Sequence, residues 1–267
     1  MIKIGIIGTG NMGYAFLKGL LKEYKPEQIL VMDVNREKRE AVAQETGVTA
    51  LDDNAELVRQ ADYIVLAVKP QYYDSVLRVI KNALTDEKIL ISIAAGITID
   101  SLRQKLGPDK RIVRAMPNTP ALIGDGMSGV SYEETLFTDE EKETIRRFFE
   151  SFGRMVIVPE AMMNVVTCAS SSAPAYIFMF IEALADSAVK HGMPRAMAYS
   201  TIAQAVKGSA ELVLETGEHP GKLKDQVCSP GGTTIAGVAA LEEFGLRNAI
   251  IKATDACFEK CNDLRQM

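Results

Sequence analysis

The chain has 267 residues, of which 47% are hydrophobic and 24% charged, and this composition is typical of a globular protein of about two domains. The composition excludes a disordered, collagen-like or small disulfide-stapled chain. Acidic residues outnumber basic ones by 35 to 30, and the net charge is −5. Because no excess of positive charge is available to meet a phosphate backbone, we expect no nucleic-acid partner.

The cysteines and histidines form no recognisable ligand pattern. The sequence has four cysteines, at 168, 228, 257 and 261, without a CxxC pair, and two histidines. Cys257 and Cys261 would share one face of a helix, and we interpret them as packing residues of a reduced cytosolic protein. The sequence therefore predicts neither a metal site nor a disulfide.

Two apolar stretches are too short to act as a signal peptide or to span a membrane. Residues 1–8 are too short for a signal peptide, and the apolar run 175–181 is ended by Glu182 and Asp186. We therefore expect a soluble, cytoplasmic protein with no membrane partner.

The first half of the chain alternates strand and helix patterns. Runs rich in β-branched residues predict strands at 2–7, 29–32, 63–68, 89–93 and 111–116. Helical periodicity predicts helices at 11–24, 36–45, 53–60, 72–82 and 98–106. This alternation is typical of parallel βαβ units in an α/β fold.

The pattern changes beyond these units. Residues 125–129 read as a loop, Thr138 and Glu141 form a capping box that opens a helix to about residue 151, and a last strand is expected at 155–158. Helical periodicity alone follows, at 161–191, 194–216, 233–243 and 247–264. These helices are apolar on more than one side, so we expect an obligate dimer built through the C-terminal helices.

A glycine-rich turn joins the first strand to the first helix. Its sequence, Gly8-Thr9-Gly10-Asn11-Met12-Gly13, fits GxGxxG in the strand–turn–helix context that this motif requires. Gly8 permits the tight turn, Gly10 lets the backbone approach a pyrophosphate, and Gly13 lets helix and strand pack closely. The motif predicts a Rossmann-like dinucleotide-binding domain over residues 1–159, followed by an all-helical dimerisation and substrate-binding domain over residues 160–267.

The end of the second strand gives a mixed signal about the cofactor. Asp33 lies where a carboxylate would accept hydrogen bonds from the ribose of NAD, or it is a turn residue that points away. Asn35 and Arg36 follow, and a guanidinium at this turn favours the 2′-phosphate of NADP.

The chain offers few acid–base candidates. His191 and His219 read as helix-end or turn residues. Lys69 follows the strand at 63–68, where it would flank a cofactor or would simply be solvated before a proline turn.

Residues 224–234 form an unusual segment that leads into a helix. The segment Ser229-Pro230-Gly231-Gly232 exposes several backbone N–H groups. With the hydroxyls of Ser229, Thr233 and Thr234, these groups make a cradle for a small carboxylate. The alternative is a plain helix cap, although a cap needs only one hydroxyl. A second small-residue cluster, residues 169–176, either contributes to the site or forms only the N-cap region of its helix.

In combination these motifs resemble the pyrroline-5-carboxylate reductase family over essentially the whole chain. The resemblance rests on residues 8–13, 67–70, 92–96, 114–120, 172–176, 218–221 and 224–235. It implies a Rossmann domain and a helical domain that dimerises with domain interchange, often assembling into a decamer. It also implies reduction of L-1-pyrroline-5-carboxylate to L-proline by NADPH, with NADH as the alternative.

The resemblance assigns roles to individual residues. It places the glycine-rich turn on the pyrophosphate, and Asn118 in the substrate cleft. Ser229, Gly231, Gly232, Thr233 and Thr234 would hold the substrate carboxylate, and Thr234 would be the catalytic residue that hydrogen-bonds the ring nitrogen. The remaining cofactor contacts that it implies are Asn35, Arg36, Asn54, Ala67, Val68, Lys69, Pro70, Ala94, Ala95 and Gly96.

The implied mechanism fits the short acid–base inventory, because a cyclic imine is readily protonated in water and the enzyme must mainly orient it. The family's usual Ser-Gly-Ser appears here as Ser170-Ser171-Ser172, which leaves the backbone around Ser171 open. Two rival interpretations are a dinucleotide-binding regulatory subunit and a β-hydroxyacid-dehydrogenase-like oxidoreductase. The latter relies on a helix-borne lysine, and no lysine occurs between residues 159 and 189.

Overall fold

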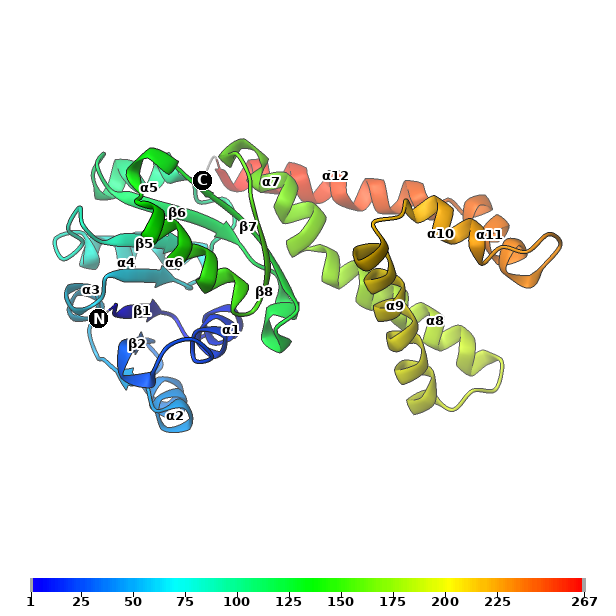
Figure 1. Ribbon diagram of the computed structural model, residues 1–267, viewed down its shortest axis with the longest axis horizontal. Coiled ribbons are helices and arrows are strands. Elements are labelled where there is room, and N and C mark those ends of the chain that lie inside the picture. Colours follow the sequence, from blue (N-terminus) through cyan, green and yellow to red (C-terminus); the bar gives the residue numbers. More distant parts are fainter. Residues whose placement is uncertain (1, 266–267) are drawn as a thin grey trace. The chain divides into compact units, whose positions relative to one another are not determined.

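The computed structural model describes residues 2–265 (Figure 1). The described residues divide into two compact units: unit 1 comprises the residues up to Ser172 together with those from Cys257 onward, and unit 2 is Ala173–Ala256. The predicted division between residues 159 and 160 falls inside unit 1. The reason is local packing, since the short helix α7 (Met163–Val166) lies against strand β7 (Gly126–Tyr132) and buries Met163 completely.

Unit 1 is built on an eight-stranded sheet with the order β3-β2-β1-β4-β5-β6-β7-β8. All neighbouring strands are parallel except β6 and β7. The first six positions follow the order 3-2-1-4-5-6 of dinucleotide-binding folds, in which the chain reverses direction beside β1. The strands are β1 (Ile4–Ile7), β2 (Ile29–Met32), β3 (Thr49–Ala50), β4 (Tyr63–Leu66), β5 (Ile89–Ser92), β6 (Arg111–Met116), β7 (Gly126–Tyr132) and β8 (Gly153–Ile157).

Helices cover both faces of this sheet (Figure 1). One core cluster includes side chains of α1 (Asn11–Leu20), α2 (Arg36–Thr46) and α6 (Asp139–Glu150). The other includes side chains of α3 (Asn54–Gln60), α4 (Tyr73–Ile80) and α5 (Ile99–Leu106). On the first face the ring of Phe16 meets that of Phe149 edge to face at 5.5 Å. The continuously apolar central strands are buried on both sides, as the sequence predicts for a parallel sheet.

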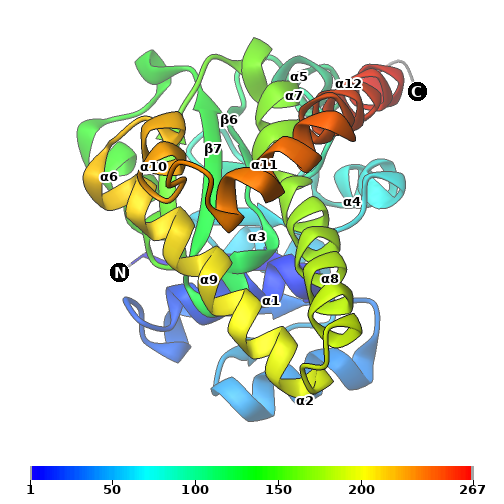
Figure 2. The same ribbon diagram turned by 90° about the vertical axis from the view of Figure 1, so that its right-hand side faces the viewer.

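Unit 2 is entirely helical in its regular structure. Its helices are α8 (Ala173–Lys190), α9 (Arg195–Thr216), α10 (Pro220–Gln226), α11 (Thr233–Glu243) and the first part of α12 (Leu246–Arg265). The helices α8 and α9 pack as an antiparallel pair joined by a short turn (Figure 2). The α/β fold class, with a Rossmann-like sheet domain followed by helices, is therefore confirmed.

Several predicted elements were wrong. Residues 125–129, predicted as a loop, belong to strand β7, which is antiparallel to β6. Its glycines suggested a loop, but they allow close approach, since a Cβ on Gly129 would lie 2.6 Å from Val166. The helix predicted at 161–191 is interrupted by a π-helix at Thr167–Ser171. The short elements β3 and α10 were not predicted at all.

Candidate functional site

The glycine-rich turn lies at the carboxyl end of β1, as the sequence predicts. Gly8 has φ +97° and its N–H donates to the Met32 carbonyl at 2.7 Å. A Cβ on Gly13 would lie 2.0 Å from the Gly8 carbonyl oxygen, so the turn and the helix need a glycine there to pack. Among the described atoms, nothing lies within 4 Å of a Cβ built on Gly10. Two of the glycines therefore close the turn, and Gly10 leaves space beside it.

The first turn of α1 presents backbone donors to that space. Gly10 is the N-cap of α1, and no side chain of the described residues caps this helix. The first N–H groups of a helix have no intrahelical acceptor, and they concentrate positive potential at this end. In contrast, α2, α3, α5 and α6 are capped by Asn35, Asp53, Thr98 and Thr138. The arrangement at Asn11, Met12 and Gly13 fits a pyrophosphate.

The carboxylate of Asp33 is engaged within the protein. Its Oδ2 accepts from the Thr9 N–H at 2.7 Å and the Thr9 hydroxyl at 3.0 Å, and its Oδ1 accepts from the Asn35 N–H at 3.0 Å. Partial burial works to raise the pKa of this carboxyl, but the hydrogen bonds from Asn35 and Thr9 outweigh burial and hold the pKa below its usual value. Of the two interpretations left open by the sequence, the geometry favours the turn residue.

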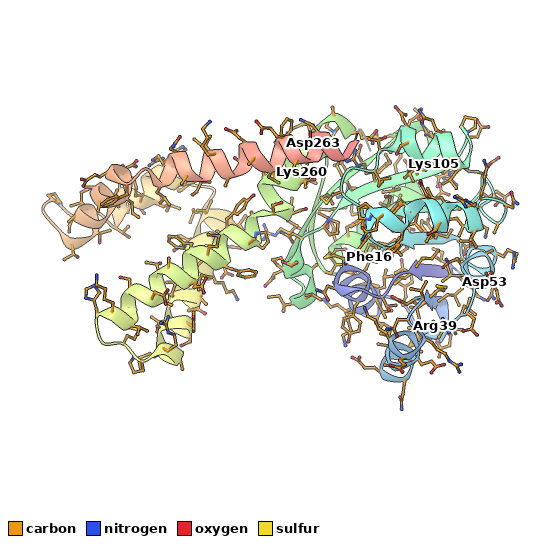
Figure 3. All side chains as sticks on the ribbon, turned by 180° about the vertical axis from the view of Figure 1, so that it is seen from behind. Phe16, Arg39, Asp53, Lys105, Lys260 and Asp263 are labelled. Atoms are coloured by element: carbon orange, nitrogen blue, oxygen red, sulfur yellow. The ribbon has the colours of Figure 1, made fainter. Side chains whose placement is uncertain are left out.

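Asn35 and Arg36 form the start of α2, next to this turn. The Asn35 side chain caps the helix by accepting from the Lys38 N–H at 3.0 Å. The Arg36 side chain is 78% exposed, and its Nε donates to Glu40 at 2.6 Å. Arg39, on the same helix (labelled in Figure 3), is buried. Its side chain donates to the Asp33 carbonyl at 3.0 Å and pairs with Asp52. A hydrogen-bonded turn thus carries an exposed guanidinium.

Asn54 begins α3 and is only 9% exposed. Its Oδ1 is a buried oxygen without a hydrogen-bond partner among the residues 2–265. Leaving such a group unpaired costs about 1–3 kcal/mol of folding free energy. A hydroxyl donor of a ligand would remove this penalty, so the residue fits the ribose contact that the resemblance implies.

Two further predicted segments follow strands at the same edge of the sheet. The first follows β4, and its Ala67 N–H donates to the Ile7 carbonyl at 2.8 Å. The second follows β5 and includes Gly96, with φ +78°. Carboxyl ends of parallel strands meet at one edge, where dinucleotides bind in open α/β sheets. The predicted residues brought to this edge are Ala67, Val68, Lys69, Pro70, Ala94, Ala95 and Gly96.

The Asn118 side-chain amide makes hydrogen bonds to other residues of unit 1. Its Oδ1 accepts from the Met127 N–H at 2.8 Å, and its Nδ2 donates to the Ser170 carbonyl at 3.4 Å. Ser171 donates from its hydroxyl to the Pro117 carbonyl at 3.0 Å. Within the described residues no non-glycine residue has positive φ, so Ser171 needs no glycine conformation. Asn118 therefore ties the end of β6 to the π-helix, and its contact with a substrate stays a prediction.

The second donor cluster lies in unit 2. Gly231 has φ +69°, and the Gly232 N–H donates to the Ser229 carbonyl at 3.0 Å. Gly232 is the N-cap of α11, and no side chain within the described part of the chain caps this helix. A Cβ on Gly232 would lie 2.4 Å from the Ser229 hydroxyl oxygen, so a side chain there would displace this hydroxyl. The hydroxyls of Ser229, Thr233 and Thr234 are on exposed residues beside these N–H groups.

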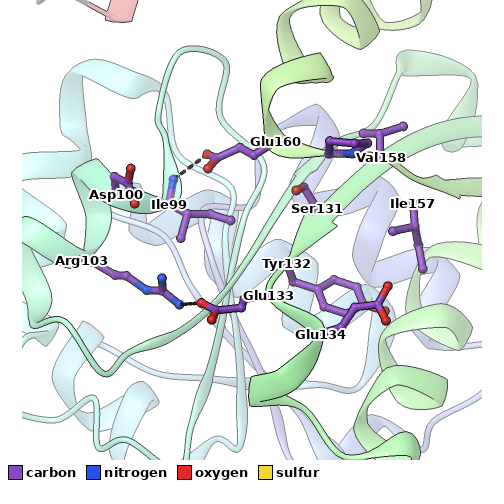
Figure 4. Close-up of a pocket in the computed structure, with 11 residues that line it drawn as sticks. Ile99, Asp100, Arg103, Ser131, Tyr132, Glu133, Glu134, Ile157, Val158 and Glu160 are labelled. Carbon is purple, nitrogen blue, oxygen red and sulfur yellow. Dashed lines mark hydrogen bonds and ion pairs between the residues drawn. The ribbon is translucent and has the colours of Figure 1, made fainter.

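A pocket of about 430 Å³ lies elsewhere in unit 1, beside α5, β7 and β8 (Figure 4). Glu133 pairs with Arg103 at 3.0 Å, and Glu160 accepts from the Ile99 N–H at 2.7 Å. Two of its acidic side chains thus already have partners. No residue of this lining was predicted as a site residue, because the pocket has no glycine-rich or helix-start signal that would have found it.

The two histidines lie where the sequence placed them, in turns. His191 follows the last residue of α8, and His219 is the N-cap of α10, where its Nδ1 accepts from the Gly221 N–H at 3.0 Å. Lys69 is exposed, in the segment between β4 and α4. Both histidines therefore lie at helix ends, as the sequence predicts.

Two family models match different parts of the chain. A family model described as pyrroline-5-carboxylate reductase dimerisation matches residues 160–264, and one described as NADP oxidoreductase coenzyme F420-dependent matches residues 3–96. The pyrroline-5-carboxylate reductase of Escherichia coli K12 is 49% identical over 98% of both chains. That of Arabidopsis thaliana is 39% identical, over 99% of this chain and 96% of the plant protein.

A solved structure shows the same fold. The pyrroline carboxylate reductase of Plasmodium falciparum, described with NADP bound, has a TM-score of 0.90 and 33% sequence identity over 99% of this chain and 98% of that one. The fold and the phosphate-binding turn define a dinucleotide-dependent oxidoreductase with a helical dimerisation domain. The chain belongs to the pyrroline-5-carboxylate reductase family.

Proposed function

We propose that this protein reduces L-1-pyrroline-5-carboxylate to L-proline with NADPH, NADH being the alternative donor, in the last step of proline biosynthesis. The observation that carries the proposal is the pair of glycine-capped helix starts at α1 and α11. The first fits a pyrophosphate and the second fits a small carboxylate. Full-length relatives that bear the name of this activity support the same conclusion.

The cofactor assignment rests on unit 1. The α1 turn would hold the pyrophosphate, and Asn54 would contact the adenosine ribose. The engaged Asp33 carboxylate leaves Arg36, with Asn35, as the groups that meet the ribose end of the dinucleotide. A guanidinium there favours the 2′-phosphate of NADPH. The Plasmodium falciparum enzyme was solved with NADP bound, which agrees with this choice.

The substrate assignment rests on residues 229–234. Their N–H groups would hold the substrate carboxylate, and the Thr234 hydroxyl would hydrogen-bond the ring nitrogen. The reduced nicotinamide supplies the hydride to the imine carbon. The ring nitrogen is readily protonated in water, so Thr234 orients this nitrogen, and solvent completes the proton balance. Orientation of this kind can remove a large part of a reaction barrier, which explains why no histidine is needed.

The proposal includes a homodimer built through the C-terminal helices, with a decamer as the further assembly, in the cytoplasm. By length and composition, Glu160–Lys190 is apolar enough to cross a membrane, and 17% of the tested window is buried in the single chain. The same residues begin the segment matched by the dimerisation model. A second copy of the chain is therefore the partner that we propose for this apolar surface, rather than lipid.

Turnover with the purified protein tests the activity. The loss of reduced-nicotinamide absorbance is followed with L-1-pyrroline-5-carboxylate, with NADPH and NADH titrated separately. We expect kcat/KM above about 10⁴ M⁻¹s⁻¹ with NADPH, the lower end of the usual enzyme range. Tight NADPH binding without turnover would contradict the proposal and favour the regulatory-subunit alternative.

Replacing Thr234 tests the role of its hydroxyl. Thr234→Ala should lower kcat about 10-fold or more, with the roughly 10²–10⁴-fold effect of general acid–base groups as an upper guide. The residue is exposed, so the variant should unfold at the same temperature as the wild type. Thr234→Ser, which keeps the hydroxyl, serves as the matched control. An unchanged kcat/KM in Thr234→Ala would remove this residue from the mechanism.

A further inference from the structure

Three of the four cysteines converge in unit 1. Cys168 lies in the π-helix, and Cys257 and Cys261 lie one turn apart near the end of α12. Their three sulfur atoms all lie within 4.8 Å of one another. Cys168 and Cys261 are buried and Cys257 is half-buried. The fourth, Cys228, is in unit 2 and is not part of this cluster.

The backbone around the cluster is held in place from two sides. The π-turn is closed by the Ser172 N–H, which donates to the Thr167 carbonyl at 2.9 Å. The end of α12 lies beside α7, where the Asn164 amide donates to Asn262 at 2.9 Å (Figure 1, Figure 2). A π-turn is rare and occurs often at functional sites. The three sulfurs are thus brought together by elements that are already fixed, which is what a ligand triad requires.

The spacing of the sulfurs suits a metal ion. Three sulfurs that each lie about 2.3 Å from a zinc ion are about 3.8 Å apart in tetrahedral geometry, so each sulfur has to move by less than about 1 Å to close the site. Three protein ligands leave a fourth position for water. The Ser172 hydroxyl, 3.3 Å from the Cys257 sulfur, lies beside the triad and is placed to hydrogen-bond such a water.

We propose that Cys168, Cys257 and Cys261 form a three-thiolate site for a soft cation of the Zn²⁺ class. Thiolates select soft or borderline cations, and neither carboxylate nor imidazole is among the three donors. The metal site is independent of the proposed reductase reaction and is additional to it.

Burial determines the protonation state of the metal-free cluster. Burial, followed by the neighbouring thiols, raises the pKa of Cys168 to about 12, and burial also raises the pKa of Cys261. The protein alone therefore keeps these groups as neutral thiols, whereas a coordinated metal ion deprotonates them outright. Three thiolates around a divalent ion leave one negative charge. The fully buried Arg114 lowers the pKa of Cys261, opposing burial, while its guanidinium pairs with Glu160 at 3.1 Å.

The triad lies close to both points where the chain passes between the two units. The chain passes from unit 1 to unit 2 after Ser172 and returns at Cys257. A metal ion bound to Cys168, Cys257 and Cys261 would fasten the π-helix and α12 to each other next to both crossings. Binding to the folded state alone raises the unfolding temperature as the metal concentration rises above the dissociation constant.

Metal titration of the reduced, metal-free full-length protein tests the proposal. Under anaerobic conditions, Co²⁺ should produce a sulfur-to-cobalt charge-transfer band that saturates at one ion per chain, and Zn²⁺ should displace it. X-ray absorption of the Zn²⁺ form should show three sulfur neighbours. Wild-type protein with no charge-transfer band, or with only nitrogen and oxygen neighbours, would overturn the proposal and leave the triad as packed thiols.

Variants locate the ion. Cys168→Ser and Cys261→Ser should weaken Zn²⁺ binding by more than the roughly 10–100-fold that follows loss of an outer-shell partner. Cys228→Ser is the matched control and should bind like the wild type. Circular dichroism of each variant shows whether weaker binding comes from the missing thiolate or from unfolding. The X-ray absorption result on the wild-type protein does not depend on whether a variant folds. Binding that survives in both triad variants, or is lost in Cys228→Ser, would contradict the assignment.

Discussion

The two units bury their apolar side chains to very different degrees. Unit 1 has two core clusters, one on each face of its sheet. In Ala173–Ala256, all of which the structure describes, the buried residues are Ala185 and Ala198 alone. Large apolar side chains such as Phe178, Leu214 and Phe244 are exposed in the single chain. Unit 1 therefore has its own core, whereas the helices of unit 2 need a further apolar surface, as expected of a dimerisation domain.

The two helix starts that present backbone N–H groups, at α1 in unit 1 and at α11 in unit 2, also differ in burial. The α1 turn is closely packed, because Gly13 lies directly against the Gly8 carbonyl. The turn before α11 is exposed, and the residues around it are held by local contacts such as that between Gly232 and Ser229. We infer that cofactor binding is encoded in a rigid element of one chain. The turn proposed to bind the substrate is exposed in the single chain, so we expect it to depend more on the assembly of unit 2.

The largest effect should follow from charging the exposed face of α8. Phe178 and Met179 are 62% and 69% exposed in the single chain. Phe178→Glu combined with Met179→Glu would bury charge in the proposed dimer, at a penalty of about 4 kcal/mol or more, which is about 1,000-fold in the dissociation constant. Size-exclusion chromatography with light scattering should show monomers at micromolar concentration.

The matched control for this variant is in unit 1. Val79, on α4, is an apolar residue that is 48% exposed. Val79→Glu should leave the protein dimeric, because this side chain belongs to the unit with its own core. A charged α8 variant that remains a stable dimer would show that the dimer uses a different surface.

A pair of glycine substitutions separates folding from binding in unit 1. Gly13→Ala should lower the free energy of unfolding by about 1–3 kcal/mol, because the new methyl group clashes with the Gly8 carbonyl. Gly10→Ala adds a methyl group in open space, so it should leave chemical denaturation unchanged and weaken NADPH binding about 10-fold or more by blocking the pyrophosphate. If Gly10→Ala bound NADPH as tightly as the wild type, the pyrophosphate would lie elsewhere.

Removing the Arg36 guanidinium should separate the two cofactors. Arg36→Ala should raise the KM for NADPH about 10-fold, because a charge-assisted hydrogen bond contributes about 1.5–3 kcal/mol. The KM for NADH should stay the same, since NADH has no 2′-phosphate. Lys38→Ala, on the same helix, is the control, and steady-state kinetics with both cofactors is the measurement. Equal losses with NADPH and NADH would show that Arg36 does not discriminate between them.

Sequence reasoning predicted the elements whose signal is local. The buried strands β1, β2 and β4, the turn at Gly8 and the capping box at Thr138 are each encoded by adjacent residues, and each is found. Strand β7 was missed because its glycines serve contacts with Ala121 and Val166, which are distant in sequence or belong to another element. Spacing along the chain does not reveal such contacts.

The candidate site shows the same division. Helix starts that follow a glycine turn are local signals, so the α1 turn and the turn before α11 could both be predicted from the sequence. The role of Asp33 depended on Thr9, which approaches it only when β1 and β2 pair. The cysteine triad was missed for the same reason, because Cys168 meets Cys257 and Cys261 only through the fold. Sequence alone left the role of Asp33 open, and it did not indicate that Cys168 meets the other two cysteines.

The smallest effect concerns acid stability and the same Asp33 turn. Its pKa in the folded state lies below its ordinary value of 3.8, since hydrogen bonds from Asn35 and Thr9 prevail over burial. The carboxylate therefore contributes stability above that ordinary value, and the contribution is lost as the pH falls through the folded-state pKa. Asp33→Asn should unfold at a lower temperature than the wild type at neutral pH, and the difference should shrink below about pH 4. Asp109→Asn, at an exposed turn residue, should follow the wild-type curve. A constant difference between Asp33→Asn and the wild type at every pH would mean that the charge of Asp33 does not stabilise this turn.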